Sequence, residues 1–103
     1  DLEKDILEYI SHSEEPKDLQ IDRILEKSKG VSHQKIAKLL IEKEMWYDVA
    51  ESLEKFEGVD HKEIAKLLIE EGYWSAVINN LKKFEKLDSE TVELLLKEVR
   101  EAE

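Results

Sequence analysis

Three histidines are the side chains of this sequence best suited to metal binding or acid–base chemistry, and their spacing argues against both. His33 and His61 lie 28 residues apart, each three residues after a glycine, and His12 stands apart near the N-terminus. Metal ligands must converge within about 2 Å of one ion, whereas equivalent sites in neighbouring helical hairpins lie about 10 Å apart. We therefore expect three surface histidines at helix ends, no metal site and no cofactor.

Acidic residues are abundant, but none has the setting that acid–base catalysis requires. A catalytic carboxyl group needs an apolar environment that raises its pKa, and no lone Asp or Glu interrupts an apolar stripe of this sequence. Glu42 follows Lys38, and Glu70 follows Lys66, at the four-residue spacing of ordinary surface ion pairs on a helix. No nucleophile elbow, phosphate-binding loop, dinucleotide-binding motif or calcium loop is present. The sequence therefore predicts a protein that is not an enzyme.

Composition narrows the class of partner. Of 103 residues, 26 are acidic and 16 are basic, and the formal net charge is -10. A chain this acidic, with its lysines dispersed among acids, repels the phosphates of nucleic acids and of anionic membranes. No apolar run could cross a bilayer, no secretory signal is present and there is no cysteine. We expect a cytoplasmic monomer that binds neither nucleic acid nor membrane.

A 28-residue repeat organises the elements that carry these side chains. Residues 30–57 and 58–85 are identical at 16 of 28 positions, including the heptapeptide IAKLLIE, which begins at Ile36 and again at Ile64. Repeats of this length indicate stacked supersecondary units. The 103 residues are expected to form a single domain, divided into a divergent N-terminal hairpin (1–29), two repeat units (30–57 and 58–85) and a C-terminal capping helix (86–103).

Each repeat unit has the sequence signals of a helical hairpin. Asp60 with Glu63 is a capping box in front of the first helix, and Ser32 is the equivalent cap of the earlier unit. Gly72 can end that helix in the left-handed conformation without steric cost. Glu44 stands at the equivalent position of the other unit, so we expect the two hairpins to have slightly different connections.

The two helices of each unit differ in their apolar faces. In IAKLLIE only the Lys and the Glu are polar, so the first helix should pack against neighbours on two sides. We expect Ile36, Leu40, Ile64 and Leu68 to be buried, and Lys38 and Lys66 to be exposed. The second helix has one stripe with spacings of three and four, formed by Trp46, Val49, Ala50, Leu53 and Phe56 in one unit and Trp74, Val77, Ile78, Leu81 and Phe84 in the other.

The remaining segments complete an all-α fold. An N-terminal amphipathic helix, a connector at residues 11–17 and a second helix precede the repeat, and a final helix capped by Asp88 or Ser89 follows it. In total we expect about seven helices of about 10 to 15 residues each.

Aromatic residues near the hairpin turns are the remaining candidates for binding. Trp and Tyr are favoured at the centres of protein interfaces. Trp46 and Trp74 lie in register with the apolar stripes and are predicted to pack in the core. Met45, Tyr47 and Tyr73 are predicted to be partly exposed and to form a contact patch for a protein or peptide partner.

The hairpin repeat resembles the alpha-solenoid class, of which tetratricopeptide repeats are the familiar members. The resemblance implies an all-α stack of hairpins, either right- or left-handed. The period here is 28 residues rather than 34, and the Trp-x-x-Leu-Gly signature is absent. No binding residue is therefore transferred from the tetratricopeptide family.

The sequence also resembles designed helical proteins. The tail DSETVELLLKEVREAE consists of strong helix formers behind a cap, and Glu and Lys alternate on the polar faces. The stretches EKEMWYDVAE and SHSEEPKDLQ are less regular, like natural sequences. Two hypotheses stay open: a designed scaffold with no evolved activity and no required partner, and a natural helical-repeat module for protein–protein interaction.

Overall fold

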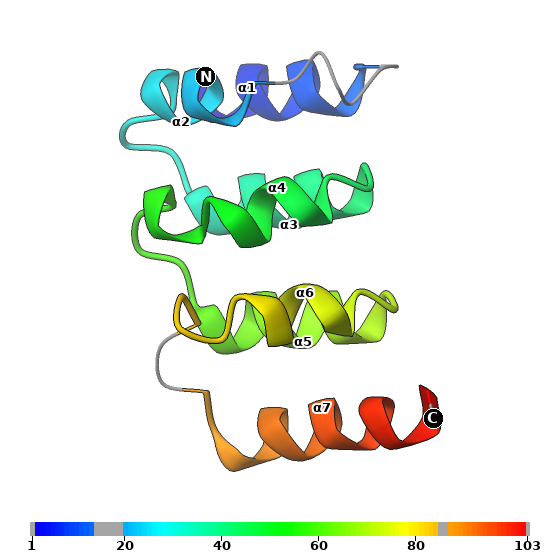
Figure 1. Cartoon of the computed structure of the whole chain (residues 1–103). Helices are drawn as coiled ribbons and strands as arrows, with labels where there is room; N and C mark the ends of the chain where they lie inside the picture. Colours follow the sequence, from blue (N-terminus) through cyan, green and yellow to red (C-terminus); the bar gives the residue numbers. More distant parts are fainter. Residues whose placement is uncertain (1, 14–19, 85–86, 103) are drawn as a thin grey trace.

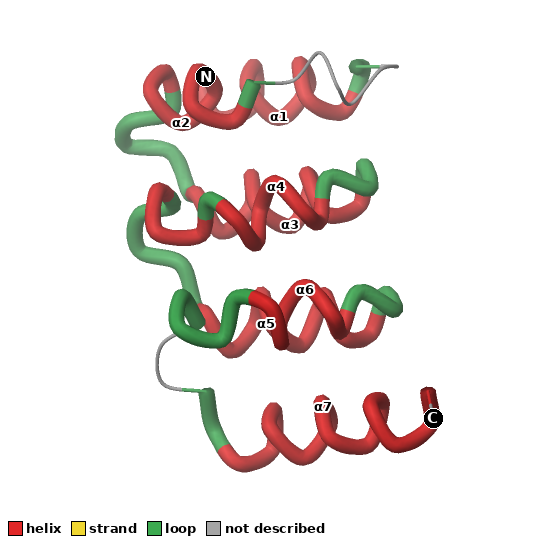
Figure 2. The backbone as a smooth tube through the Cα atoms, viewed as in Figure 1, coloured by secondary structure: helices red, strands yellow, loops and turns green. Residues whose placement is uncertain are grey.

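The computed structural model describes residues 2–13, 20–84 and 87–102. Within these residues the chain is all-α, with no strand (Figure 2). The seven α-helices are α1 (Leu2–Ser11), α2 (Ile21–Lys27), α3 (His33–Glu42), α4 (Trp46–Glu51), α5 (His61–Glu70), α6 (Trp74–Asn79) and α7 (Ser89–Ala102), and a 3-10 helix, η2 (Leu53–Lys55), follows α4. Most of the connector predicted at residues 11–17 lies outside the described residues.

Successive helical pairs lie one below another along the long axis of the molecule (Figure 1). α3 contacts both α1 and α5, and α5 in turn contacts α7, so these four helices form one row. α4 lies in front of α3 and contacts α6, which lies in front of α5. α2 is joined to the end of this second row by the ion pair between Lys55 and Asp22, whose Nζ and Oδ1 atoms are 2.7 Å apart.

The core lies between the two rows, and it includes the apolar side chains of the repeated heptapeptide. Ile36, Leu40, Ile64 and Leu68 are each 0% exposed, which confirms the burial predicted for them. The apolar heptapeptide positions are buried because both helices that carry them have neighbours on several sides. Replacing such a side chain would leave a cavity, so this helix pair is the part of the fold most sensitive to substitution.

Ion pairs connect successive helices of the first row, and this corrects the pairing expected within each helix. Lys38 of α3 pairs with Glu63 of α5 at 2.5 Å rather than with Glu42. Lys66 of α5 pairs with Glu90 of α7 at 3.6 Å. Both lysines are partly exposed, so the contribution of each pair to the free energy of unfolding is small, on the order of 0.5 kcal/mol.

The helix caps follow the prediction in part. The Asp60 carboxylate accepts hydrogen bonds from the backbone N–H groups of Lys62 and Glu63, and the Ser32 hydroxyl accepts one from Lys35. The reciprocal half of the capping box is not formed, because the Glu63 side chain bonds to α3 instead. The backbone N–H of Asp60 donates to the side chain of Gln34 at 2.8 Å.

Both hairpins turn in the same way, so the expectation of two different connections was wrong. Glu44 has a φ of 68° and Gly72 a φ of 90°, both in the left-handed region. The surrounding hydrogen bonds hold Glu44 there, although this conformation costs a non-glycine residue about 1 kcal/mol. The matching backbone bonds are Glu44 N–H to Ile41 O and Met45 N–H to Leu40 O in one hairpin, and Gly72 N–H to Ile69 O and Tyr73 N–H to Leu68 O in the other.

The second helix of each hairpin is shorter than its apolar stripe. α4 and α6 have six residues each, and the end of each stripe lies in η2 or in turns. Phe84 is buried, but Leu81 is 48% exposed, which corrects its assignment to the core. Asn80 explains the early end of α6, because its side chain donates to the carbonyl of Ala76 at 2.9 Å and so competes with the helical bond to that oxygen.

Candidate protein-contact face

The structure separates the three residues predicted to contact a partner. Tyr47 is 58% exposed and Tyr73 is half-buried, but Met45 is only 6% exposed and belongs to the core. The predicted partial exposure of Met45 was therefore wrong. Met45 lies at the N-cap of α4, where its backbone N–H closes the hairpin turn and its side chain packs inward.

An aromatic cluster joins the two hairpins next to their turns. The rings of Trp46 and Tyr73 are stacked, with centroids 4.9 Å apart and an interplanar angle of 14°. Tyr47 meets the edge of Trp46 at 6.0 Å and 85°. Trp46 and Trp74 are mostly buried against the core but keep part of their surface exposed, so they contribute both to stability and to the surface. The stacking also fixes the ring orientations that a partner would meet.

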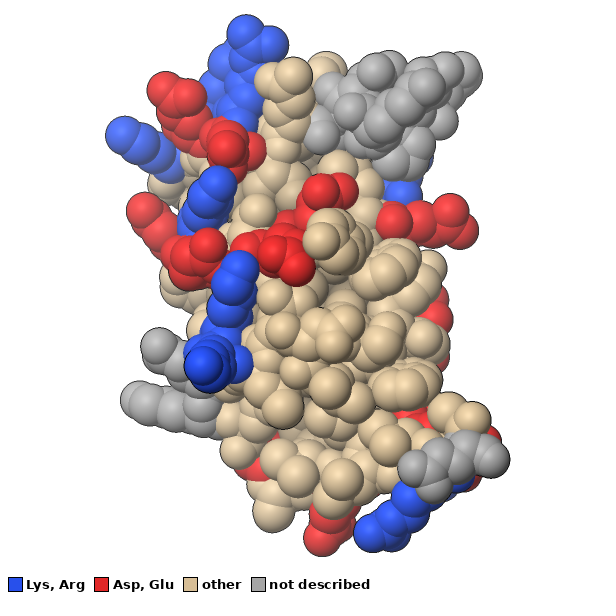
Figure 3. Space-filling model, in the orientation of Figure 1, with Lys and Arg blue, Asp and Glu red and all other residues tan. Residues whose placement is uncertain are grey.

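The segment of chain that carries part of this cluster contains no charged residue. Residues 72–81, GYWSAVINNL, contain no charged side chain, although 42 of the 103 residues are charged. The equivalent residues of the preceding unit, 44–53, include three acids: Glu44, Asp48 and Glu51. Figure 3 shows an uncharged expanse over α6 and the adjoining part of α4; most of the charged side chains in view lie to its left, and others lie at the right and lower margins. A partner could cover this surface without burying a charge.

We call this surface the contact face. Its members are uncharged, lie on α4, α6 or the turns beside them, and keep part of their side chains exposed: Trp46, Tyr47, Tyr73, Trp74, Ser75, Ile78, Asn79 and Leu81. Ion pairs lie near the ends of these helices, where Lys83 is 3.9 Å from Glu51 and 3.6 Å from Glu54. An uncharged centre with charged residues at its margin is the usual composition of a protein interface.

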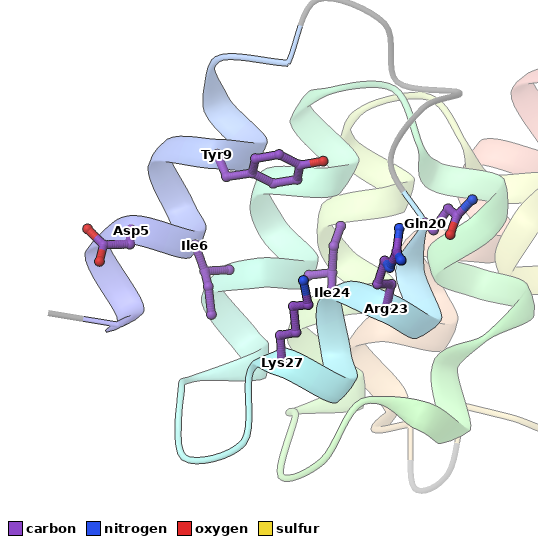
Figure 4. A pocket seen from close by; sticks show the side chains of 7 residues that line it. All are labelled: Asp5, Ile6, Tyr9, Gln20, Arg23, Ile24 and Lys27. Atoms are coloured by element: carbon purple, nitrogen blue, oxygen red, sulfur yellow. The ribbon is translucent and has the colours of Figure 1, made fainter.

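A groove between α1 and α2 is a second concave feature, with a volume of about 330 Å³. Ile6 and Ile24 form its apolar part, and the Tyr9 ring points from α1 toward α2 (Figure 4). Arg23 and Lys27 line the α2 side. The groove holds no carboxyl group paired with a base or nucleophile, so its geometry suggests no reaction.

His12 is exposed as predicted and His61 is partly exposed, but His33 differs from its predicted position on the surface. His33 is buried, and its Nδ1 accepts a hydrogen bond from the backbone N–H of Glu57 at 2.8 Å. His33 and His61 meet the rings of Phe56 and Phe84 edge to face, each at 6.3 Å. His33 is thus a structural residue that the sequence interpretation missed. The signal that could have revealed it is the repetition of the same His–Phe pair, 23 residues apart, in both units.

Two ionisable groups have shifted pKa values, and both are explained by local structure. The hydrogen bond and charge of Asp22 raise the pKa of Lys55. The hydroxyl and backbone N–H of Thr91 donate to Asp88 at 2.6 and 2.8 Å, and these bonds lower the pKa of the Asp88 carboxyl. Asp88 directly precedes α7, so it acts as the predicted cap of that helix. Neither group lines the groove or belongs to the contact face.

Neither a metal site nor a membrane-spanning helix is present among the described residues. No group of three or more His, Cys, Asp or Glu side chains there could hold a metal ion. None of the helices described is long and apolar enough to cross a membrane. Comparisons with protein-family models, curated proteins and solved structures found no match.

Proposed function

We propose that this protein is a non-catalytic helical-repeat module that binds a partner protein through the contact face. The observation that carries the proposal is the absence of charge from residues 72–81 in a chain that is 41% charged. Covering such a surface removes apolar and aromatic area from water and leaves no unpaired charge behind. The face carries partly exposed Trp and Tyr side chains, and Trp and Tyr are among the residue types that contribute most to protein interfaces.

The internal comparison between the two units supports this interpretation. The acids Asp48 and Glu51 of α4 are replaced by Ala76 and Asn79 in α6, while Trp and Val stay the same at the preceding core positions. Glu51 and its counterpart Asn79 are both exposed, so an outward charge is lost at this position, whereas Ala76 is buried. The loss of the outward charge at Asn79 supports a role in binding.

A stack of equivalent hairpins suits such a function. The 28-residue repeat, the matching turns at Glu44 and Gly72 and the two rows of helices support the alpha-solenoid interpretation. In stacks of this kind equivalent helices line a continuous surface, so one partner can contact several units. Here α4 and α6 would supply the aromatic and the uncharged parts of that surface.

Two observations favour an evolved module over an idealised scaffold that needs no partner. Glu44 holds a left-handed conformation that design would assign to glycine, the residue present at the equivalent Gly72. Residues 72–81 carry no charge, whereas a surface chosen for solubility mixes both signs throughout. Both features lower the stability or solubility of the isolated chain.

Photo-crosslinking in the cells that produce the protein tests the proposal. A photoreactive phenylalanine is placed at Tyr47 or Ser75, both exposed on the contact face, and at Glu26, exposed on α2, as the control. We expect one discrete crosslinked partner from both contact-face positions and none from Glu26. Adding Asn79→Lys should remove the crosslink without changing the melting temperature. Equal labelling from all three positions would refute the proposed face.

A further inference from the structure

At the C-terminal end, the first row of helices includes one helix, α7, that has no counterpart in the second row. α3 has α4 in front of it and α5 has α6, whereas no helix among the described residues lies in front of α7 (Figure 1). α7 packs on α5 and also contacts α6. The place beside α7 that would continue the row of α4 and α6 is therefore vacant in the described part of the chain.

The side of α7 that faces this place has kept its apolar residues. In the 28-residue register, Val92 and Leu96 hold the positions of Ile64 and Leu68 in α5. Ile64 and Leu68 are fully buried, whereas Val92 is 39% exposed and Leu96 is 46% exposed. Two large apolar side chains thus remain where α5 has its buried residues, although α7 has no corresponding helix to cover them.

A different side of α7 has lost its apolar residues. Glu93 and Lys97, both exposed, hold the positions of the buried Ala65 and Ile69. Ile69 follows Lys66 by three residues and shares its side of α5, the side on which Lys66 pairs with Glu90 of α7. The corresponding side of α7 would face a further layer, and it is charged. The side of α7 that would face a further layer thus lacks apolar residues, and what remains apolar fits a single helix rather than another hairpin.

We propose that the vacant place beside α7 binds one amphipathic helix of another protein, in the way that α6 packs on α5. The chain supplies the template for this ligand. Both second helices begin with Trp, followed by Val three, Leu seven and Phe ten positions later, at Trp46 and at Trp74. A helix with this stripe, lying antiparallel to α7, would cover Val92 and Leu96. This site is separate from the contact face and does not depend on it.

Net charge determines which of the two second-helix sequences is expected to bind α7. Residues 89–102, which form α7, contain four acids and two bases, a net charge of 4 × (−1) + 2 = −2. Residues 72–84 contain two lysines and no acid, a net charge of +2, whereas residues 44–56 contain four acids and one lysine, a net charge of −3. A basic helix of the α6 type is attracted to α7, and an acidic helix of the α4 type is repelled. The expected ligand is therefore a basic amphipathic helix.

A peptide titration against the whole protein tests the inference. The probe is a fluorescein-labelled peptide with the sequence of residues 72–84, and the matched control has the sequence of residues 44–56. We expect saturable binding of the first peptide in the micromolar range by fluorescence anisotropy, and at least a tenfold weaker affinity for the second at low salt. Equal affinity for both peptides, or no binding up to about 1 mM, would overturn the proposal.

Variants of α7 show whether the peptide occupies the proposed place. Val92→Glu and Leu96→Glu alter exposed side chains, so circular dichroism should show unchanged helicity and melting temperature while affinity falls at least tenfold. Val59→Ala, at a partly buried position outside α7, serves as a stability control, because it loosens packing without changing a residue of the proposed site. Binding that survives Leu96→Glu would mean that the peptide replaces α6 within the fold, which contradicts docking beside α7. Dimerisation of the protein through α7, detected by analytical ultracentrifugation and abolished by Leu96→Glu, would also contradict it.

Discussion

The imidazole of His33 closes the hairpin that contains it. Its Nδ1 accepts a 2.8 Å hydrogen bond from the backbone N–H of Glu57, 24 residues later in the chain. This bond ties the start of α3 to the segment that leaves the same hairpin, next to Phe56. A residue type usually examined for chemistry thus has a structural role here.

His33→Ala should destabilise the protein by about 1 to 2 kcal/mol, because it removes the acceptor of a partly buried backbone donor and the edge-to-face contact with Phe56. Urea denaturation followed by circular dichroism measures the change. His12→Ala, at an exposed position, is the control and should change the free energy of unfolding by less than about 0.5 kcal/mol. Equal effects of the two substitutions would show that the His33 bond contributes nothing.

Glu44→Gly should stabilise the protein by about 0.5 to 1 kcal/mol, because glycine adopts the positive φ of this turn without strain. Gly72→Ala tests the same geometry in the opposite direction and should destabilise by about 1 kcal/mol. A Cβ atom at Gly72 would meet no heavy atom within 4 Å, so the effect comes from the backbone alone. Thermal melting of both variants checks the pair, and effects of the same sign would contradict the assignment.

Leu68→Ala should cost about 2 to 5 kcal/mol of stability, because Leu68 is fully buried and its removal leaves a cavity. Leu81→Ala provides the matched control. Leu81 ends the apolar stripe of its unit but is 48% exposed, so its loss should cost less than about 1 kcal/mol. Chemical denaturation of both variants measures the difference, and comparable losses would place Leu81 in the core after all.

Asp88→Asn should remove a component of the pH dependence of stability. The bonds from Thr91 lower the folded-state pKa of Asp88 below its usual value of 3.8. The ionised cap therefore stabilises the fold above that value, and the stabilisation is lost as the pH falls through the folded-state pKa. Asn keeps a capping side chain that does not titrate. We expect the two proteins to differ in melting temperature at neutral pH and to converge as the pH falls below the folded-state pKa of Asp88. A constant difference at all pH values would exclude this role.

Features that depend on residues near in sequence were predictable. The caps at Ser32, Asp60 and Asp88 are local, because a side chain bonds to N–H groups two or three residues away. The burial of Ile64 and Leu68 follows from helical periodicity, which places them on the same face in any helix. The sequence by itself therefore determined the all-α class, the helix caps and most of the buried heptapeptide positions.

Features that depend on which helices meet were decided only by the tertiary structure. Lys38 has an acid four residues away in its own helix, yet it pairs with Glu63 because α5 brings that carboxylate closer. His33 is buried because the chain returns to it at Glu57, and Met45 because the hairpin turn directs it inward. The exposure of Leu96 has the same origin. The sequence shows that Leu96 is apolar. Only the arrangement of the two rows shows that α7 lacks a helix in the place that α6 occupies beside α5, so that Leu96 is exposed whereas Leu68 is buried.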